Sequence, residues 1–488
     1  MSELLDKILA RENMNRAYKH VTAKKSSAGI DGITVDNVSD YIKENWTRIE
    51  EEIRIRKYKL TPVKRVVIPK PNGGKRNLGV PSVMDKIIQQ AMVQVLSPIC
   101  EVHFSENSYG FRPGKSCEMA IMKLLEYFNE GYIWIVDIDL EKFFDKVPQD
   151  KLMSYAHEII NDGDVESLIR RYLQAGVMED GAYQETSEGT VQGNPISPLL
   201  SNIMLNKLDK ELEDRNLRYT RYADDVVIVT KSKASANRVM HSITKWIERK
   251  LGLKVNATKT KITTPAKLKY LGFGFYYNNA QKAYKSRPHQ ESIQSFKRKL
   301  KQLTIRKYSM TVSDRIRQLN QKIRGWLNYF NICDMKMAMK EIDQHLRTRL
   351  RVIIWKQWKV PSKRQWGLQK LGIGKGLAKQ TSYQGNRYQW IATKTCVVRA
   401  ISKRILAKKG LISCLDYYIL RHNLKIKTNR LVPNGMLGGE RVIKFTLLDS
   451  TLMWKSMVGK WKTTVGFVIL DFLINRIGEL YLSLKVRF

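Results

Sequence analysis

Acidic residues inside two strongly apolar runs place the tightest constraint on how this chain can fold. Val- and Ile-rich strands are normally buried on at least one face. Burying a carboxylate costs several kcal/mol unless it is paired or holds a metal ion. The acids therefore indicate either turns at strand ends or a metal site. They are Asp137 and Asp139 in IWIVDIDL (133–140), and Asp224 and Asp225 in RYADDVVIVT (221–230).

A hairpin interpretation joins these acids into one site. If Asp224 and Asp225 form the tip of a β-hairpin, that tip can lie beside the end of the strand that carries Asp139. Three carboxylates there would hold two divalent ions ~3.5–4 Å apart, the arrangement used for in-line attack at phosphorus. Hard oxygen ligands suit Mg²⁺, with Mn²⁺ as an alternative. The plain alternative is that both pairs of acids are solvated turns.

The charge of the chain predicts a polyanionic partner. The 488 residues include 86 Lys and Arg against 46 Asp and Glu, a net charge of +40. Residues 287–430 hold 34 of the basic residues and 6 of the acidic ones, a net charge of +28. A nearly balanced first part with a basic second part is typical of a catalytic core joined to a nucleic-acid-binding module. The 43% hydrophobic content excludes wholesale disorder.

Other features narrow the class of protein further. None of the five cysteines forms a CxxC pair, so neither a zinc site nor a disulfide framework is expected. The N-terminal residues have no apolar signal core. The most apolar stretch, 465–474, is too short to span a bilayer. We therefore expect a cytoplasmic protein with no membrane partner.

The pattern of elements predicts a mixed fold. Strands are expected at 63–69, 75–81, 133–140, 221–230 and 268–277, with a PNGG hairpin turn at 71–74. Helices are expected at 1–21, 85–96, 292–303, 312–330 and 335–358. The first part thus mixes helices and strands, whereas the basic part is mostly helical.

Several ordered motifs carry a family resemblance. The motifs are AGIDG (28–32), IPKPNGGKRNLGVPSV (68–83), SYGFRPGKS (108–116), VDIDLEKFFD (136–145), VQGNPISPLLSN (191–202), RYADD (221–225), LGLKVNATKTK (251–261), LKYLGFGF (268–275) and RGWLNYF (324–330). In their order and spacing, the chain between about residues 4 and 418 resembles the reverse transcriptases encoded by bacterial group II introns, also called maturases, of the type without a nuclease domain.

The resemblance implies a fold and a domain plan. The fold is α/β (α+β), a right-hand polymerase with fingers and palm, followed by an α-helical thumb and a basic C-terminal region. The implied boundaries are 1–286 for fingers and palm, 287–365 for the thumb or maturase domain, and 366–430 for a region similar to the family's DNA-binding segment. The tail at 431–488 falls outside the resemblance.

The resemblance also implies roles for individual residues. Asp139, rather than Asp137, matches a metal-binding aspartate because the family places an aromatic residue five positions downstream, here Phe144. The metal-binding set is Asp139, Asp224 and Asp225; the dNTP-binding set is Lys70, Arg76, Phe144, Gln192 and Lys259; the primer–template set is Tyr222, Leu271, Gly272 and Arg112; and the RNA- or DNA-binding set is Arg324, Arg347 and Arg351.

The implied function is RNA-directed DNA synthesis together with maturase activity. The expected partners are intron RNA, an RNA template with a DNA or RNA primer, target DNA and dNTPs. The chain has Val191 and Asn194 where the family usually has Pro and Gly, which we expect to affect the efficiency of polymerisation more than its existence. The alternatives are an RNA-folding maturase with an idle polymerase, and a reverse transcriptase domesticated for host defence.

Overall fold

The computed structural model describes residues 2–69, 73–307, 309–385 and 387–430. The chain divides into one compact unit, Met1–Ile419, and a second, Leu420–Phe488, of which only residues 420–430 are described. The tail predicted at 431–488 therefore lies outside the described residues. Among the helices that the structure describes, none combines the length and apolarity needed to cross a bilayer.

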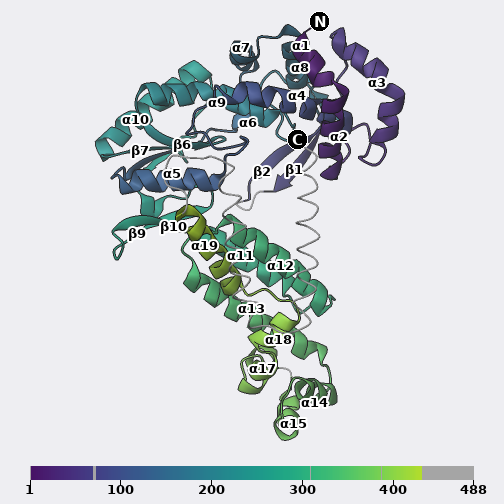
Figure 1. Cartoon of the computed structure of the whole chain (residues 1–488), viewed down its shortest axis with the longest axis vertical. Helices are drawn as coiled ribbons and strands as arrows, with labels where there is room; N and C mark the ends of the chain where they lie inside the picture. Colours follow the sequence, from purple (N-terminus) through teal and green to yellow (C-terminus); the bar gives the residue numbers. More distant parts are fainter. Residues whose placement is uncertain (1, 70–72, 308, 386, 431–488) are drawn as a thin grey trace. The chain divides into compact units, whose positions relative to one another are not determined.

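The N-terminal part of the first unit mixes helices and strands, as predicted (Figure 1). Its helices are α1 (Glu3–Leu9), α2 (Arg11–Ala23), α3 (Val38–Arg54), α4 (Val83–Glu101), α5 (Cys117–Asn129), α6 (Phe143–Lys146), α7 (Gln149–Ile160), α8 (Gly163–Gln174), α9 (Ser197–Asp214) and α10 (Lys233–Trp246). Its strands are β1 (Val63–Pro69), β2 (Lys75–Val80), β3 (Trp134–Ile138), β4 (Val177–Glu179), β5 (Ala182–Gln184), β6 (Arg218–Tyr222), β7 (Asp225–Thr230), β8 (Lys261–Thr263), β9 (Phe273–Asn278) and β10 (Ala283–Pro288).

The strands form two four-stranded sheets and one hairpin. The first sheet has the order β2-β1-β4-β5, the second has the order β6-β7-β3-β8, and β9 pairs with β10. The second sheet is antiparallel throughout, and β3 lies at its centre between β7 and β8. A central strand is buried on both faces, which explains why the sequence of β3 reads as a nearly continuous apolar run.

The second sheet separates two hydrophobic cores. Val136, Ile138, Val226 and Ile228 point to one face and pack in a core that includes residues of α9 and α10. Ile135, Val227 and Val229 point to the other face and pack with α5, β9 and the helices that follow β10. Because side chains alternate along a strand, Asp137, Asp139 and Asp225 fall on this second face.

The basic part is helical, also as predicted. Its elements are α11 (Gln290–Leu303), α12 (Val312–Tyr329), α13 (Lys336–Gln357), α14 (Pro361–Lys370), α15 (Lys375–Ser382), α16 (Tyr388–Ile391), α17 (Thr395–Ala400), α18 (Lys403–Lys408) and α19 (Cys414–Arg430). In α12 the buried residues Ile316, Leu319, Ile323 and Leu327 recur every three or four positions, which gives the helix one apolar stripe. Thr311 caps the helix by accepting a hydrogen bond from the backbone N–H of Asp314.

A buried acid on α13 fixes the start of α19. Asp343 Oδ1 accepts from the backbone N–H of Cys414 (2.7 Å), and Oδ2 accepts from Ser413 Oγ (2.6 Å) and from the N–H of Leu415 (3.1 Å). We expect Asp343→Ala to destabilise this docking by about 2 kcal/mol, because it removes a cap and leaves buried donors unpaired. Hydrogen exchange at the first amides of α19 measures the effect.

An exposed acid on α12 provides the control for that prediction. Asp314→Ala removes a carboxylate that lies at the surface beside Arg317. The expected cost is below about 1 kcal/mol, as for other exposed ion pairs. Equal exchange rates in wild type and the Asp343 variant would contradict the capping role.

Candidate active site

The register of the second sheet brings two of the predicted acids together. In the β3–β7 ladder Ile138 lies opposite Val226, so the next position places Asp139 opposite Asp225. Strands β6 and β7 are joined by a two-residue turn, with Tyr222 paired to Asp225 and Asp224 in the turn. The predicted hairpin tip is therefore present, and it lies beside the end of β3.

The carboxylates of this site repel one another. Burial raises the pKa of Asp224, and the charge of Asp139 raises it further. Asp225 is open to solvent on one side. Even so, the surrounding protein keeps water from much of the carboxylate, and this desolvation raises its pKa to about 7. The negative charges of Asp224, Asp137 and Asp139 contribute to the same shift. Such an arrangement favours the binding of a cation, because a positive charge would offset both the cost of burying the carboxylates and their mutual repulsion.

Lysine supplies part of that positive charge. Lys259 Nζ lies 3.1 Å from Asp139 Oδ2, and both side chains are partly exposed. The loop that carries Lys259 also holds the Asp139 backbone. Asn256 N–H donates to the Asp139 carbonyl (2.8 Å), and Asp139 N–H donates to Thr260 Oγ1 (3.2 Å).

The donor chemistry fits a hard divalent ion, but the described residues do not form a closed ligand cage. Asp139, Asp224 and Asp225 offer only carboxylate oxygens, which suit such ions. Across the described ranges no three His, Cys, Asp or Glu side chains are grouped closely enough to hold a metal. Asp137 lies on the same face of β3 as Asp139. Burial raises its pKa to about 6, and the charge of Lys261 opposes that shift.

A buried network that the sequence analysis missed supports the turn. Arg221 and Asp209 are both fully buried and form a two-pronged ion pair, with Nε–Oδ1 at 2.8 Å and Nη2–Oδ2 at 2.5 Å. Arg221 Nη1 also donates to Asn202 Oδ1 and to the carbonyl of Ala223, each at 3.0 Å. The sequence carries little signal for this pair, because β6 (RYTRY) also contains Thr220 and a second arginine, Arg218.

Glycine is required where a loop meets this turn. A Cβ atom on Gly110 would lie 2.2 Å from the backbone nitrogen of Ala223, so no larger residue fits there. The Gly110 carbonyl accepts a hydrogen bond from Asn202 Nδ2 at 2.9 Å. Ala223 itself has a φ of 57°, in the left-handed region that L-residues rarely adopt. The turn is therefore held by its neighbours in a conformation that costs free energy.

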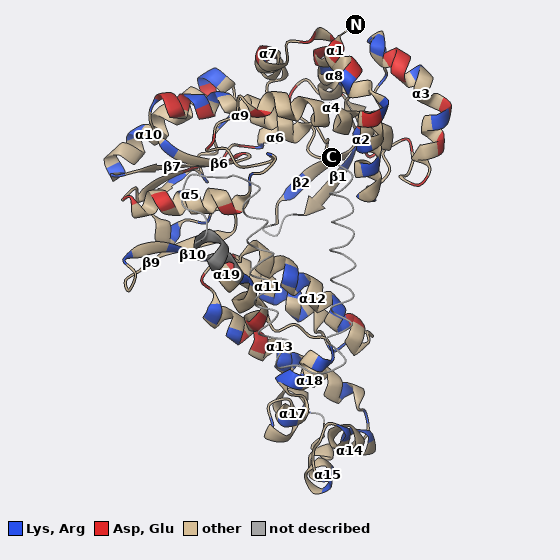
Figure 2. Cartoon of the chain, in the orientation of Figure 1, with Lys and Arg blue, Asp and Glu red and all other residues tan. Residues whose placement is uncertain are grey.

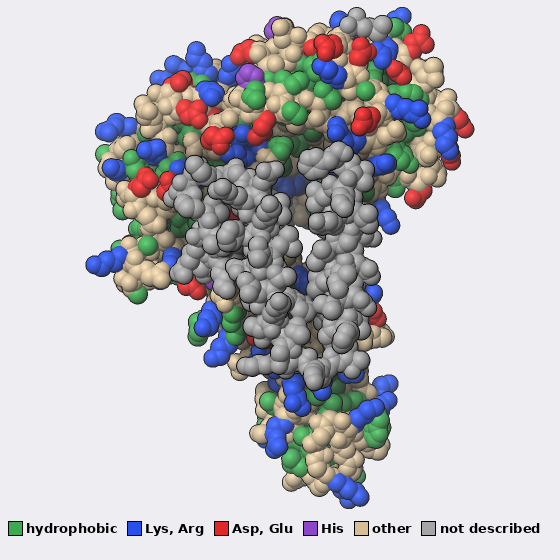
Figure 3. All heavy atoms as spheres, in the orientation of Figure 1, with side chains coloured by type: hydrophobic (Ala, Val, Ile, Leu, Met, Phe, Trp, Pro, Cys, Tyr) green, Lys and Arg blue, Asp and Glu red, His purple; other side chains and the backbone are tan. Residues whose placement is uncertain are grey.

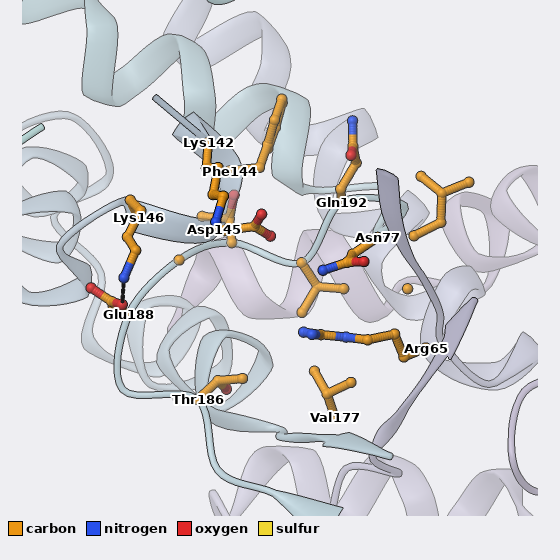
Figure 4. A pocket seen from close by; sticks show the side chains of 15 residues that line it. Arg65, Asn77, Lys142, Phe144, Asp145, Lys146, Val177, Thr186, Glu188 and Gln192 are labelled. Carbon is orange, nitrogen blue, oxygen red and sulfur yellow. Dashed lines mark hydrogen bonds and ion pairs between the residues drawn. The ribbon is translucent and has the colours of Figure 1, made fainter. Parts of the chain in front are cut away.

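A cavity of about 240 Å³ contains two of the predicted nucleotide-binding residues (Figure 4). Phe144 from α6 and Gln192 from the 191–194 loop both line it, together with Arg65 and Asn77 from the β1–β2 hairpin. At the rim Lys146 forms an ion pair with Glu188. The cavity therefore lies between the hairpin of the first sheet, the segment that follows β3 and the loop between β5 and α9.

The two residues that differ from the family pattern lie at this junction. Gly79 N–H donates to the Gln192 carbonyl at 2.7 Å. A Cβ on Gly79 would come 2.1 Å from Cγ1 of Val191. Asn194 is buried, and its Oδ1 has no hydrogen-bond partner among the described residues. Val191 thus packs directly against Gly79 of the hairpin, while Gln192 lines the cavity.

The structure describes one of the two predicted hairpin cations. Lys70 lies outside the described residues. Arg76, on β2, is exposed, and its charge lowers the pKa of Asp224. It is thus near enough to the acidic site to act on it electrostatically.

The predicted primer-contacting turn is tied to the helical part. Leu271 and Gly272 have φ values of 51° and 79°. The Leu271 carbonyl accepts from Tyr329 Oη (3.0 Å), and the Gly272 carbonyl accepts from Ser292 Oγ (2.8 Å) and from His289 N–H (3.0 Å). Helices α11 and α12 therefore hold the backbone of this turn. Tyr222 is half-buried at the end of β6.

Comparison with known proteins identifies the fold that carries this site. Residues 68–275 match the family model described as Reverse transcriptase (RNA-dependent DNA polymerase). Residues 293–372 match the model of the Group II intron, maturase-specific domain. Protein YkfC of Escherichia coli is 32% identical over 272 residues, which cover 48% of this chain and 71% of that protein. The chain belongs to the group II intron reverse transcriptases.

Two further relatives match shorter segments of this reverse transcriptase. The group II intron-encoded protein LtrA of Lactococcus lactis is 34% identical over 206 residues, covering 42% of this chain and 34% of LtrA. A putative COX1/OXI3 intron 2 protein of Saccharomyces cerevisiae is 36% identical over 203 residues, covering 41% of this chain and 23% of that protein. The chain thus spans about a third or less of the length of these two relatives.

These matches confirm the predicted family, fold class and enzyme class. The mixed N-terminal part is a reverse transcriptase, an RNA-directed DNA polymerase, and the helices after it include a maturase domain. Reverse transcriptases use divalent metal ions, in agreement with the all-carboxylate donor set. The predicted roles of individual residues remain predictions.

Two predicted nucleic-acid contacts of this reverse transcriptase need correction. Arg112 was predicted to contact primer and template, but its guanidinium is buried, pairs with Glu101 (2.7 Å) and donates to the Ser108 carbonyl (2.8 Å). Arg351 was predicted to contact RNA or DNA, but it is buried, and its Nε donates to the Ile401 carbonyl (3.0 Å). The guanidinium of Arg112 is thus satisfied inside the protein, and that of Arg351 is turned into it.

The other two predicted arginines of the maturase domain differ in accessibility. Arg324 is exposed on α12, whereas Arg347 is half-buried with Nη1 3.9 Å from Asp343 Oδ2. Arg324 is thus the freer of the two to contact a phosphate.

Proposed function

We propose that this chain copies RNA into DNA at the Asp139–Asp224–Asp225 site and binds the RNA of its own intron through the maturase domain. The observation that carries the proposal is the sheet register, which sets Asp139 opposite Asp225 and beside the turn with Asp224. The cavity lined by Phe144 and Gln192 supports it.

The three aspartates are proposed to hold two Mg²⁺ ions, with Mn²⁺ as a substitute. When bound, such ions lower the pKa of an attacking 3′-hydroxyl and offset the charge of the triphosphate. The chain's own contribution is to fix the carboxylates in advance. The Arg221–Asp209 network holds the turn, and the loop carrying Lys259 holds Asp139.

Around the acids, we propose that separate groups handle the nucleotide and the primer. Arg76 and Lys70 bind the triphosphate, Phe144 packs under the sugar and selects dNTPs, and Gln192 lies along the nucleotide. Lys259, which already neutralises Asp139, offsets charge near the reacting phosphates. Tyr222, Leu271 and Gly272 support the primer end, with the exposed backbone of the turn close to the nucleic acid.

The basic helices are proposed to bind RNA and DNA. Lys and Arg side chains run along α12, α13 and α18, where few acids accompany them (Figure 2). A space-filling view shows basic side chains on the helical segment formed by α14 to α18 (Figure 3). We propose that residues 287–365 form an RNA-binding thumb and that residues 366–430 bind target DNA. We also propose that the protein acts in the bacterial cytoplasm, on these substrates.

Primer extension tests the proposed polymerase directly. The full chain is given an RNA template, an annealed DNA primer and dNTPs, with Mg²⁺ or with EDTA. Extension with Mg²⁺ alone supports the proposal. An absence of extension by a folded chain that binds the duplex would contradict it and would favour the idle-polymerase alternative.

An arginine pair on the maturase helices tests the binding surface. Arg324→Ala should weaken intron RNA binding and lower the slope of log Kd against log salt by about one, because an exposed phosphate contact is lost. Arg351→Ala should instead lower the melting temperature and leave the salt slope unchanged, because its guanidinium is buried. A reversed pattern would contradict the surface assignment.

A further inference from the structure

Phe111, in the loop before α5, combines two unfavourable properties. Its φ is 59°, in the left-handed region, and its side chain is 53% exposed. A bulky residue in that region is strained, whereas glycine adopts it freely. An exposed ring recovers little hydrophobic free energy. Folding alone therefore does not account for an aromatic residue at this position.

The residues on both sides of Phe111 are firmly anchored. Gly110 before it accepts a hydrogen bond from Asn202 Nδ2 at 2.9 Å. Arg112 after it is buried and paired with Glu101 at 2.7 Å. The backbone conformation of Phe111 is thus imposed by its surroundings, which fixes where the exposed side chain leaves the loop.

That place adjoins the catalytic turn. The Gly110 Cα lies directly against the backbone of Ala223, where an added Cβ would come within 2.2 Å of the nitrogen. Ala223 immediately precedes Asp224 and Asp225. Phe111 therefore follows directly after the residue whose backbone contacts the segment with two of the proposed metal ligands.

We propose that the Phe111 ring packs against the primer–template duplex beside its reacting end and acts as a positioning residue. The inference rests on the proposed function, since the duplex is what this site would act on. Aromatic rings contact bases and sugars without regard to sequence. Because the ring is uncharged, it contributes to duplex affinity but not to its salt dependence.

Three substitutions separate the ring from the backbone strain. Phe111→Ala removes the ring and keeps the strained φ, Phe111→Gly removes both, and Phe111→Tyr keeps both. We expect the Kd for an RNA template–DNA primer duplex to rise on the order of tenfold in the Ala and Gly variants and to stay within about twofold in the Tyr variant. The KM for dNTP and the salt slope should not change. The Gly variant should melt at a higher temperature than the Ala variant.

A remote residue in the left-handed region provides the control. Asn216 has a φ of 52° and lies beyond the other end of β6 from Tyr222. Asn216→Gly should leave duplex affinity unchanged. Unchanged affinity in both the Ala and Gly variants of Phe111, with an active wild type, would overturn the inference alone. A wild type that binds the duplex but does not extend the primer would instead overturn the proposed function.

Discussion

A chain with both Asp224→Asn and Asp225→Asn is expected to lose DNA synthesis by at least about a thousandfold. Divalent ions in such a site lower the activation barrier by several kcal/mol, because they stabilise the charge of the transition state. Each 1.36 kcal/mol of barrier corresponds to about a factor of ten in rate. The amide keeps the size of each side chain, so the fold should persist. Single-nucleotide incorporation on a primed RNA template measures the effect.

A matched acid outside the site controls for the loss of charge. Asp150 is exposed on α7, where it pairs with Arg170 at 3.0 Å. Asp150→Asn should therefore synthesise DNA at the wild-type rate. Continued synthesis by the double variant would contradict the assignment of the catalytic acids.

The same double variant should be more stable than wild type in metal-free buffer at pH 8. The raised pKa values of Asp224 and Asp225 mean that ionisation of the folded state is disfavoured. The protonated carboxyl groups therefore favour the folded state at low pH. This contribution to stability is lost as the pH rises through the pKa of the folded state, which is about 7 for Asp225. The stability difference should therefore shrink as the pH falls from 8 to 5, as measured by thermal unfolding.

The double variant also separates the two proposed activities. Intron RNA binding and splicing assistance should survive in it, because the basic helices that are proposed to contact RNA lie outside the acidic site. Loss of both activities in a folded variant would show that polymerase and maturase are not separable. Splicing assistance without any DNA synthesis in the wild type would favour the idle-polymerase alternative.

Breaking the buried ion pair beneath the turn is expected to have the largest effect on stability. Asp209→Ala leaves the guanidinium of Arg221 buried without its counter-ion. We expect the free energy of unfolding to fall by about 3–5 kcal/mol, as is typical when one partner of a buried ion pair is removed. Because Arg221 also donates to the Ala223 carbonyl, the catalytic turn should lose its support. Urea unfolding and primer extension measure the two consequences.

A surface pair on the same helix is the matched control. Glu211 and Arg215 form a partly exposed ion pair on α9. Glu211→Ala should cost less than about 1 kcal/mol and leave DNA synthesis unchanged. The combined change Asp209→Leu with Arg221→Met should recover much of the lost stability but little of the activity, because no side chain then binds the turn. Similar costs for Asp209→Ala and Glu211→Ala would contradict the role of the buried pair.

The sequence by itself determined the main elements and predicted the acidic site. Apolar, β-branched runs predicted β1, β3, β7 and β9, and helical patterns predicted the long helices, because burial in a core imposes those patterns on the residues. Carboxylates inside Val- and Ile-rich runs were informative because their burial is costly without a compensating charge. The excess of basic residues after position 286 likewise indicated a part that binds a polyanion, because so much positive charge repels itself unless a negatively charged partner is present.

The tertiary structure alone decided which residues are accessible and which acids meet. Asp139 faces Asp225 because of strand register, which depends on pairing between segments far apart in sequence. Arg112 and Arg351 resemble phosphate contacts in the sequence, yet both are buried, Arg112 against Glu101 and its own loop and Arg351 against the distant carbonyl of Ile401. The pairing of Arg221 with Asp209 was likewise invisible, because the burial of a charge depends on distant residues that close around it.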